Sequence, residues 1–509
     1  MSILDYVPLG ITLRPIQIEV LKKVEARFPV TDTIVINADT GSGKSIIAKT
    51  IANWLETKGL TTAILTPRLD LMDQYLESFT GLPSIRGLEH YHCNKLDTSC
   101  ANKRLQKRRC KDCPYSKANK EAAESKQAVY NPFLYSVLKK GNRAGGKITN
   151  KHYKDVLIID EAHTLYSSLT DEHTARIWHH EFKYPKNLKT HGDAALWMQK
   201  TAKRILGKIN NLSEEEQTTY ENTILARRME RWDRVAEAIN RDENSFFIET
   251  TKELYGGIER PCLKISPKTL RNEPSRIWLS SNKCKILMSG TISEIDLKHL
   301  GIKADPKNFI VPDAVIPAAN RPIIAKDLIN MGAKYQTKNA PKLVERLLRL
   351  AEQHQGKGLV HVTYGLMSKI KPLLKGNKRF LFHTREDRVG ALEKFKNSKD
   401  LILVGAGMSE GLDLAGPEYE WQVVAKVIYP SLNDSVVKDW YRNDTDRLNW
   451  EIAKWLIQAC GRNCRDKDDY GVTYILDSNL GNPVKQQYGF FQKANHLLPD
   501  HFKERFVWT

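Results

Sequence analysis

The sequence predicts an α/β fold of parallel sheets with helices on both faces, divided between several structural units. Short apolar runs recur along the chain and predict buried strands, as in TIVINA at 33–38, VLII at 156–159 and LVHV at 359–362. Amphipathic helical patterns alternate with these runs, which is typical of parallel sheets. At 509 residues the chain exceeds what one hydrophobic core holds, so we expect three or four structural units.

The composition is that of an ordinary globular protein with a strongly basic balance. Hydrophobic residues make up 41%, and Lys plus Arg exceed Asp plus Glu by 79 to 60, a net charge of +19. This charge fits a solvated basic surface and a nucleic-acid partner about equally well. The first ten residues do not resemble a signal peptide, and no run of eighteen apolar residues occurs. We therefore expect a cytoplasmic protein, without membrane spans, whose cysteines stay reduced.

The segment ADTGSGKS at 38–45 predicts a phosphate-binding loop, because it joins a predicted strand to a helical pattern. Two glycines let the backbone approach the β- and γ-phosphates of a nucleotide closely. Lys44 would reach the same phosphates, and Ser45 would offer its hydroxyl to Mg²⁺. Ala38 stands where the general pattern has its first glycine. The ATP-binding residues expected here are Thr40, Gly41, Ser42, Gly43, Lys44 and Ser45.

A second apolar strand ends in two carboxylates, in VLIIDEAH at 156–163. Asp160, at the end of the strand, is predicted to hold Mg²⁺ through water. Glu161 is predicted to position or deprotonate the water that attacks the γ-phosphate. The alternative is an ordinary acidic turn, which the preceding phosphate loop disfavours.

The third part of the predicted catalytic site is QACGRNCR at 458–465. If this segment is helical, Gln458, Arg462 and Arg465 share one face, because they lie four and three residues apart. Arginines on such a face would stabilise charge on the γ-phosphate during transfer. A basic helix face without this role is the alternative.

These motifs, together with MSGT at 288–291 and SEGLDL at 409–414, occur in the order found in superfamily 2 helicases. The resemblance, which runs from about residue 14 to 477, implies two RecA-like motor domains. It implies adenine contacts by Arg14 and Gln17, and strand contacts by Thr66 and Arg68 in TPRLDLMDQ at 66–74. It also implies that ATP hydrolysis is coupled to strand binding by Gly290, Thr291, Glu410, Gly411 and Asp413.

Four of the eight cysteines cluster between these motifs, at Cys93, Cys100, Cys110 and Cys113. Clustered thiols in a reducing compartment favour metal binding over disulfides. Their spacing leaves zinc and an iron–sulfur cluster equally open, since only the last two form a C-x2-C pair. The neighbouring His90 and His92 keep a mixed histidine–cysteine zinc site as a minor alternative.

The surroundings of these cysteines resemble the XPD/DinG family of helicases, which carries a 4Fe–4S cluster in an insertion at this point. The resemblance therefore implies that Cys93, Cys100, Cys110 and Cys113 hold such a cluster. The segment 101–111 between them contains six basic residues and no acid. It predicts a surface that contacts single-stranded nucleic acid, although a solvated loop is the alternative. The residues expected to make this contact are Lys103, Arg104, Lys107, Arg108 and Arg109.

The resemblance also predicts how the domains divide the chain. We expect the first motor domain at 1–83, 128–163 and 281–320, and the second at 321–509. An iron–sulfur domain at 84–127 and a helical arch at 164–280 would interrupt the first motor.

The function implied by the resemblance is that of an ATP-dependent DNA helicase. Such an enzyme would bind ATP and Mg²⁺ and move 5′ to 3′ on single-stranded DNA. It would open forked or tailed duplexes, and we expect it to act as a monomer. A nucleic-acid-stimulated ATPase that remodels complexes without unwinding is the alternative. A binding module with a decayed ATPase is a third hypothesis, which the intact Lys44, Glu161 and Arg462 disfavour.

Overall fold

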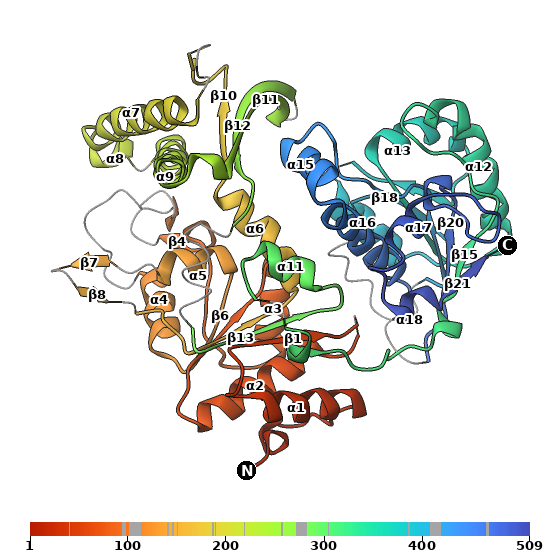
Figure 1. Cartoon of the computed structure of the whole chain (residues 1–509), viewed down its shortest axis with the longest axis horizontal. Coiled ribbons are helices and arrows are strands. Elements are labelled where there is room, and N and C mark those ends of the chain that lie inside the picture. The colour runs from red at the N-terminus through yellow and green to blue at the C-terminus, as the bar shows by residue number, and fades with distance from the viewer. Residues whose placement is uncertain are drawn as a thin grey trace. The chain divides into compact units, whose positions relative to one another are not determined.

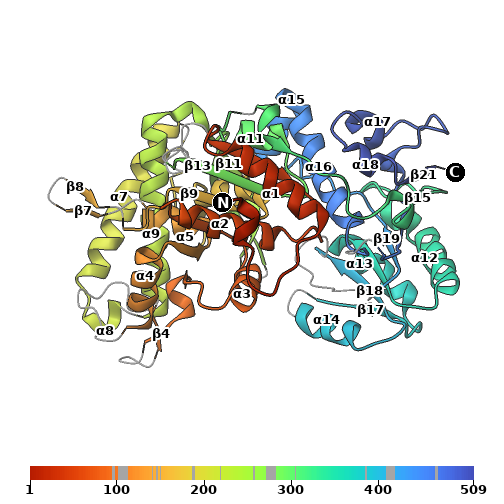
Figure 2. The same ribbon diagram turned by 90° about the horizontal axis from the view of Figure 1, so that it is seen from below.

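The computed structural model of the chain divides into two compact units. It describes residues 1–508 except 40, 94–97, 101–112, 140–141, 145–146, 150, 186–187, 189, 218, 256–257, 271–281, 304, 385–386, 408–418 and 465–467. One unit comprises Met1–Ala38 and Gly43–Pro312, and the other Asp39–Ser42 and Asp313–Thr509. Each contains a parallel sheet with helices on both faces, as Figures 1 and 2 show, which confirms the predicted α/β class. No helix in the described part of the chain is long and apolar enough to cross a membrane.

The sheet of the first unit has seven parallel strands in the order β14-β1-β13-β9-β2-β6-β3. Its central strands are buried on both faces, as the continuous apolar runs predict. The strands are β1 (Thr33–Asn37), β2 (Thr62–Leu65), β3 (Ser84–Ile85), β6 (Gln127–Tyr130), β9 (Val156–Ile159), β13 (Cys284–Ser289) and β14 (Phe309–Ile310).

Helices α1 (Pro15–Arg27) and α2 (Lys44–Thr57) pack on one face of this sheet (Figure 1). Ile34 and Ile36 of β1 lie in one core cluster with Ile47 and Ile51 of α2, because alternate strand residues share a face. The other elements of this unit outside the insertions are α3 (Leu69–Ser78), α5 (Pro132–Lys139), β7 (Asn142–Ala144), β8 (Lys147–Thr149) and α11 (Glu294–His299). Helix α6 (Leu165–Glu172) lies at the start of the segment predicted as an arch.

The insertion predicted as a helical arch is not purely helical. It contains α7 (His191–Asn210), α8 (Glu214–Gln217) and α9 (Tyr220–Arg241), and also an antiparallel sheet in the order β10-β12-β11. The sheet consists of β10 (Ala175–Trp178), β11 (Phe246–Tyr255) and β12 (Ile258–Pro267).

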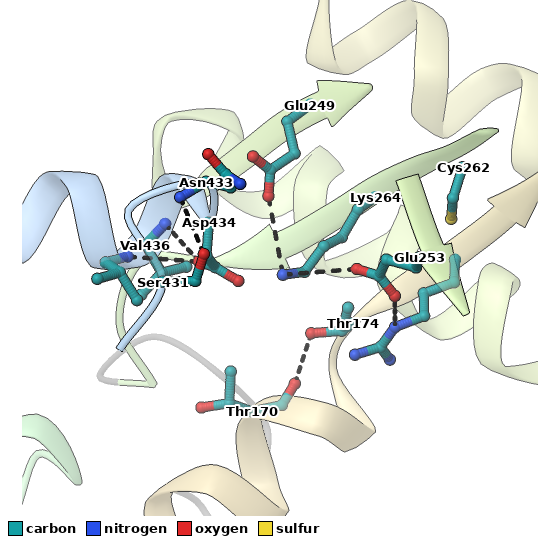
Figure 3. A network of polar contacts seen from close by, with 12 residues as sticks. Thr170, Thr174, Glu249, Glu253, Cys262, Lys264, Ser431, Asn433, Asp434 and Val436 are labelled. Atoms are coloured by element: carbon teal, nitrogen blue, oxygen red, sulfur yellow. Dashed lines mark hydrogen bonds and ion pairs between the residues drawn. The ribbon is translucent and has the colours of Figure 1, made fainter. Parts of the chain in front are cut away.

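Charged side chains pair with one another on one side of this small sheet. Lys264 Nζ lies 3.7 Å from Glu249 and 3.9 Å from Glu253, and Arg176 Nε donates to Glu253 at 2.9 Å (Figure 3). Phe246 and Leu263 belong to the core cluster of the insertion. The strands thus alternate apolar residues, which face the core of the insertion, with charged residues that pair on the opposite face.

The second unit has a seven-stranded parallel sheet in the order β17-β18-β16-β19-β20-β15-β21. Val360 and Val362 share a core cluster with Leu343 of α12, while the neighbouring Leu359 packs with Phe395 of α14. The strands are β15 (Ile323–Ala325), β16 (Gly358–Val362), β17 (Phe380–Phe382), β18 (Ile402–Ala406), β19 (Trp421–Val424), β20 (Val472–Ile475) and β21 (Phe506–Trp508). The helices are α12 (Gln336–Gln353), α13 (Tyr364–Ile370), α14 (Arg388–Lys396), α15 (Ser435–Asn443), α16 (Thr445–Cys460), α17 (Phe490–Ala494) and α18 (Asp500–Lys503).

Candidate active site

Four predicted motifs follow four adjacent strands of the first sheet, β1, β13, β9 and β2. Because these strands are parallel, their carboxyl ends lie at one edge, where α/β sheets bind ligands. Backbone hydrogen bonds continue the ladder past the strand ends. Ala38 N donates to Ser289 O at 3.1 Å, and Asp160 N donates to Leu65 O at 2.9 Å. The fold therefore gathers the motifs that the sequence separates by more than two hundred residues.

The phosphate loop turns sharply into α2. Gly41 and Gly43 have φ values of 87° and 76°, in the left-handed region that favours glycine. Gly43 caps α2, and Lys44 and Ser45 form the start of its first turn. Helix N-termini of this kind bind phosphate. Lys44 is 9% exposed, and its Nζ donates to Ala38 O at 3.3 Å. Thr40 lies outside the described residues.

The two predicted adenine-contacting residues lie at the start of α1. Arg14 precedes the helix, and its N–H donates to Gln17 Oε1 at 2.8 Å. Gln17 is buried against the phosphate loop, since a Cβ placed on Gly43 would lie 2.1 Å from Gln17 Nε2. The structure brings Gln17 to the loop, whereas its contact with adenine remains a prediction.

Gly43→Ala is expected to weaken ATP binding at least about tenfold. The new methyl group would displace Gln17, and the left-handed backbone would cost about 1–2 kcal/mol. Titration with a fluorescent ATP analogue measures the change. Gly59→Ala is the matched control, because Gly59 has a similar φ of 75° but no heavy atom within 4 Å of the added Cβ. Equal affinities in the two variants would contradict the expectation.

Asp160 is buried at the end of β9, with both carboxylate oxygens engaged. Oδ2 accepts from Tyr75 Oη at 3.0 Å, and Oδ1 accepts from the backbone N–H of Glu161 at 2.9 Å. Burial and the neighbouring Glu161 carboxylate raise the pKa of Asp160 to about 6, while Lys44 acts in the opposite direction. A divalent cation would stabilise the ionised form of this carboxylate. With Ser45 it offers the hard oxygen ligands that Mg²⁺ prefers.

Glu161 adopts a left-handed backbone conformation, with φ of 46°, which is uncommon for a residue with a side chain. Its carboxylate lies 3.3 Å from His163 Nδ1. The same His163 nitrogen lies 2.8 Å from Ser289 Oγ, which accepts a hydrogen bond from Thr291 N at 3.0 Å. His163 and Ser289 thus connect the acidic motif to the segment of Gly290 and Thr291.

Sequence reasoning assigned no role to Tyr75, Ser289 or His163. Ser289 and His163 lie inside segments that resemble helicase motifs, so their positions carried a signal. Tyr75 lies one residue beyond the segment 66–74, and its contact with Asp160 spans 85 residues. Burial, followed by Asp160, raises the pKa of Tyr75, so its hydroxyl keeps the proton that it donates.

The predicted strand-contacting residues of the segment 66–74 differ in exposure. Thr66 is fully buried, and its hydroxyl donates to Arg68 O at 3.4 Å. Arg68 precedes α3 and is partly exposed, and its Nε donates to Asp70 at 2.9 Å. The other predicted contacts, Lys103, Arg104, Lys107, Arg108 and Arg109, fall outside the described part of the chain.

In the second unit, one prediction about the arginine motif is wrong. Helix α16 ends at Cys460, and Gly461 caps it, so Arg462 lies beyond the helix and does not share a helical face with Gln458. Glycine is unfavourable inside a helix and is common at the C-terminal end of one. Arg505, which sequence reasoning missed, donates to Cys460 O at 2.8 Å and to Arg321 O at 2.8 Å. Arg465, Glu410, Gly411 and Asp413 lie outside the described residues.

Three of the four clustered cysteines are described, and they lie on neighbouring elements. Cys93 is in β4 (His92–Cys93), which pairs with β5 (Thr98–Ser99), and Cys100 follows β5 directly. Cys113 precedes α4 (Pro114–Glu124). Burial opposes ionisation of the Cys113 thiol, but hydrogen bonds from Ser116, Tyr115 and Cys100 outweigh it and lower the pKa.

These cysteines suit metal thiolate chemistry, although the described residues alone do not complete a ligand set. Two of the thiols are close enough to hydrogen bond, and one lies at a helix N-terminus, which favours the thiolate. Cys110 is outside the described residues, and among those described no group of three or more potential ligands is placed to hold a metal ion. Cys262, Cys284, Cys460 and Cys464 are buried.

Comparisons with known proteins cover both units. Residues 10–203 match the family described as type III restriction enzyme, res subunit, and residues 347–491 match the family described as helicase C-terminal domain. A probable ATP-dependent helicase of Methanocaldococcus jannaschii is 22% identical, over 77% of this chain and 73% of that protein. The ATP-dependent DNA helicase DinG of Photobacterium profundum is 23% identical over 59% of this chain. The chain spans about half of that relative, since the match covers 50% of it.

Solved structures show the same fold. Xpd4 of S. tokodaii aligns with a TM-score of 0.55 and 17% identity, over 97% of this chain and all of that one. A structure described as an XPD helicase aligns with a TM-score of 0.60 and 15% identity, over 96% of this chain and 98% of that one. Two parallel-sheet α/β domains are therefore common to this chain and these structures.

Proposed function

We propose that this chain is an ATP-dependent helicase of the XPD/DinG-like group of superfamily 2, and that it moves along single-stranded DNA and unwinds duplexes in the 5′ to 3′ direction. One observation carries the catalytic part of this proposal. The phosphate loop, the acidic pair and the segment of Gly290 and Thr291 lie at the ends of adjacent parallel strands, and the contact between His163 and Ser289 links two of them.

In the proposed reaction, the residues of this edge divide the work on ATP. Lys44 and the amides at the start of α2 hold the β- and γ-phosphates. Ser45 and Asp160 would hold Mg²⁺, which would supply positive charge to neutralise the phosphoryl group. Glu161 orients the attacking water and accepts its proton. The resemblance to superfamily 2 helicases implies that Arg462 and Arg465 would stabilise negative charge on the γ-phosphate.

The choice of DNA is supported by charge and by one relative. The net charge of +19 favours a polyanion, and the similar DinG protein of P. profundum is described as a DNA helicase. Coupling of ATP hydrolysis to strand binding would involve Gly290, Thr291, Glu410, Gly411 and Asp413. The direction of movement, the action as a monomer and the tailed or forked substrates rest on the family resemblance.

The proposal assigns a 4Fe–4S cluster to Cys93, Cys100, Cys110 and Cys113. The short hairpin of β4 and β5 and the start of α4 would provide thiolates from three separate chain positions. The cluster would hold the basic segment 101–111 in a fixed position, and this segment would contact the single strand.

Unwinding of duplexes with either a 5′ or a 3′ single-stranded tail tests the function. ATP-dependent opening of the 5′-tailed DNA alone is expected, and opening of the 3′-tailed DNA alone would overturn the direction. DNA-stimulated hydrolysis without any unwinding would instead support the remodelling hypothesis.

Metal analysis of the same anaerobically purified sample tests the cluster. Iron near four atoms per chain is expected, and zinc without iron would overturn the assignment. Cys113→Ser should lower the iron content and reduce unwinding more than hydrolysis. Cys262→Ser serves as the control, because Cys262 is a buried cysteine of β12, in the other insertion, where it pairs with Trp178 of β10.

A further inference from the structure

Tyr75 is a buried tyrosine at the predicted Mg²⁺ carboxylate. It lies in α3, is 1% exposed, and its ring centroid is 6.0 Å from that of Phe79. Its hydroxyl donates to Asp160 Oδ2 at 3.0 Å. The helix that carries it begins directly after Arg68, so α3 extends from the predicted strand-contacting segment to the ATP site.

The hydrogen bond of Tyr75 fixes the orientation of the Asp160 carboxylate. The backbone N–H of Glu161 holds Oδ1, and Tyr75 holds Oδ2, so rotation about the bond to the carboxyl group would break both contacts. Hydrogen bonds to ionised groups are short and strong, particularly where water is excluded. Each oxygen keeps acceptor capacity for a cation or a metal-bound water. The hydroxyl thus lies where partners of metal-binding carboxylates are found.

We propose that Tyr75 is a positioning residue that orients Asp160 toward the Mg²⁺ of bound ATP. The inference rests on the Mg²⁺ role of Asp160 in the proposed function. A purely space-filling role would require only the aromatic ring, which packs in the same core cluster as Met72 and Phe79. Phenylalanine preserves that ring and removes only the hydroxyl, so it separates the two roles.

The test is the affinity for a non-hydrolysable fluorescent ATP analogue, measured with Mg²⁺ and with EDTA. Mg²⁺ increases the affinity for the nucleotide, and this increase is expected to be about tenfold smaller in Tyr75→Phe than in the wild-type protein. A loss of this size is typical when a hydrogen-bond partner of a metal ligand is removed. Its affinity in EDTA should equal that of the wild-type protein, which also shows that the variant is folded. Tyr135→Phe is the matched control, because Tyr135 is equally buried in the same unit but its hydroxyl faces Asn282.

Asp160→Asn makes the two levels of the inference distinguishable. If Asp160→Asn removes the Mg²⁺-dependent affinity and Tyr75→Phe leaves it unchanged, the positioning role of Tyr75 is overturned and the proposed site stands. If neither variant alters the effect of Mg²⁺, the metal role of Asp160 is itself wrong. A thermal unfolding midpoint of Tyr75→Phe close to that of Tyr135→Phe, together with a selective loss of the Mg²⁺ effect, supports the proposal.

Discussion

Lys44→Ala is expected to lower ATP hydrolysis at least about a hundredfold, the effect typical of removing one donor to a developing charge. The Lys44 side chain is 9% exposed, and its ammonium group bonds a loop carbonyl, so it is held in place before a nucleotide binds. Its charge also opposes the rise in the pKa of Asp160. Alanine would therefore remove the cation that would face the phosphates. It would also leave the Asp160 and Glu161 carboxylates without the nearby positive charge of Lys44.

Steady-state hydrolysis with saturating single-stranded DNA measures this loss. Strand binding without nucleotide should stay within about threefold of the wild-type value, because the predicted strand contacts are elsewhere. Lys58→Ala is the matched control, since Lys58 caps the opposite end of α2 with its Nζ 4.6 Å from the ring centroid of Trp54. If Lys44→Ala hydrolysed ATP at more than a tenth of the wild-type rate, the proposed role of the phosphate loop in hydrolysis would be wrong.

The sequence was sufficient to predict the parallel sheets. Apolar runs that end in ADTGSGKS and DEAH predicted β1 and β9, and parallel strands place their carboxyl ends together. The hydrophobic periodicity of the sequence could not predict how α3 is rotated about its axis. The contact from Tyr75 to Asp160 depends on how that helix packs on the sheet, which is a property of the tertiary core.

Two sequence predictions failed, for different physical reasons. The helical spacing of Gln458 and Arg462 ignored Gly461, which ends α16 between them. In the insertion, the resemblance implied a helical arch, and the antiparallel sheet was not predicted. The pairing of Glu249 with Lys264 across β11 and β12 lets both charges lie nearly buried on a strand face.

Glu161→Gln is expected to reduce hydrolysis at least about a hundredfold while ATP affinity stays within about threefold. Glutamine has the same shape, so the left-handed turn at Glu161 and the contact between His163 and Ser289 should persist. It cannot accept a proton from the attacking water, whereas Lys44 and Asp160 remain available to hold the nucleotide and Mg²⁺. The loss should therefore appear in kcat rather than in KM.

A single-turnover experiment with prebound ATP separates the chemical step from product release. The rate of phosphate formation should fall as far as the steady-state rate, because the change acts on bond cleavage itself. Glu19→Gln is the control, since Glu19 lies on α1 and pairs with Lys23 away from the loop. If phosphate formed at the wild-type rate in Glu161→Gln, another group would have to activate the water. Among described residues, the candidate is then His163, which contacts both Glu161 and Ser289.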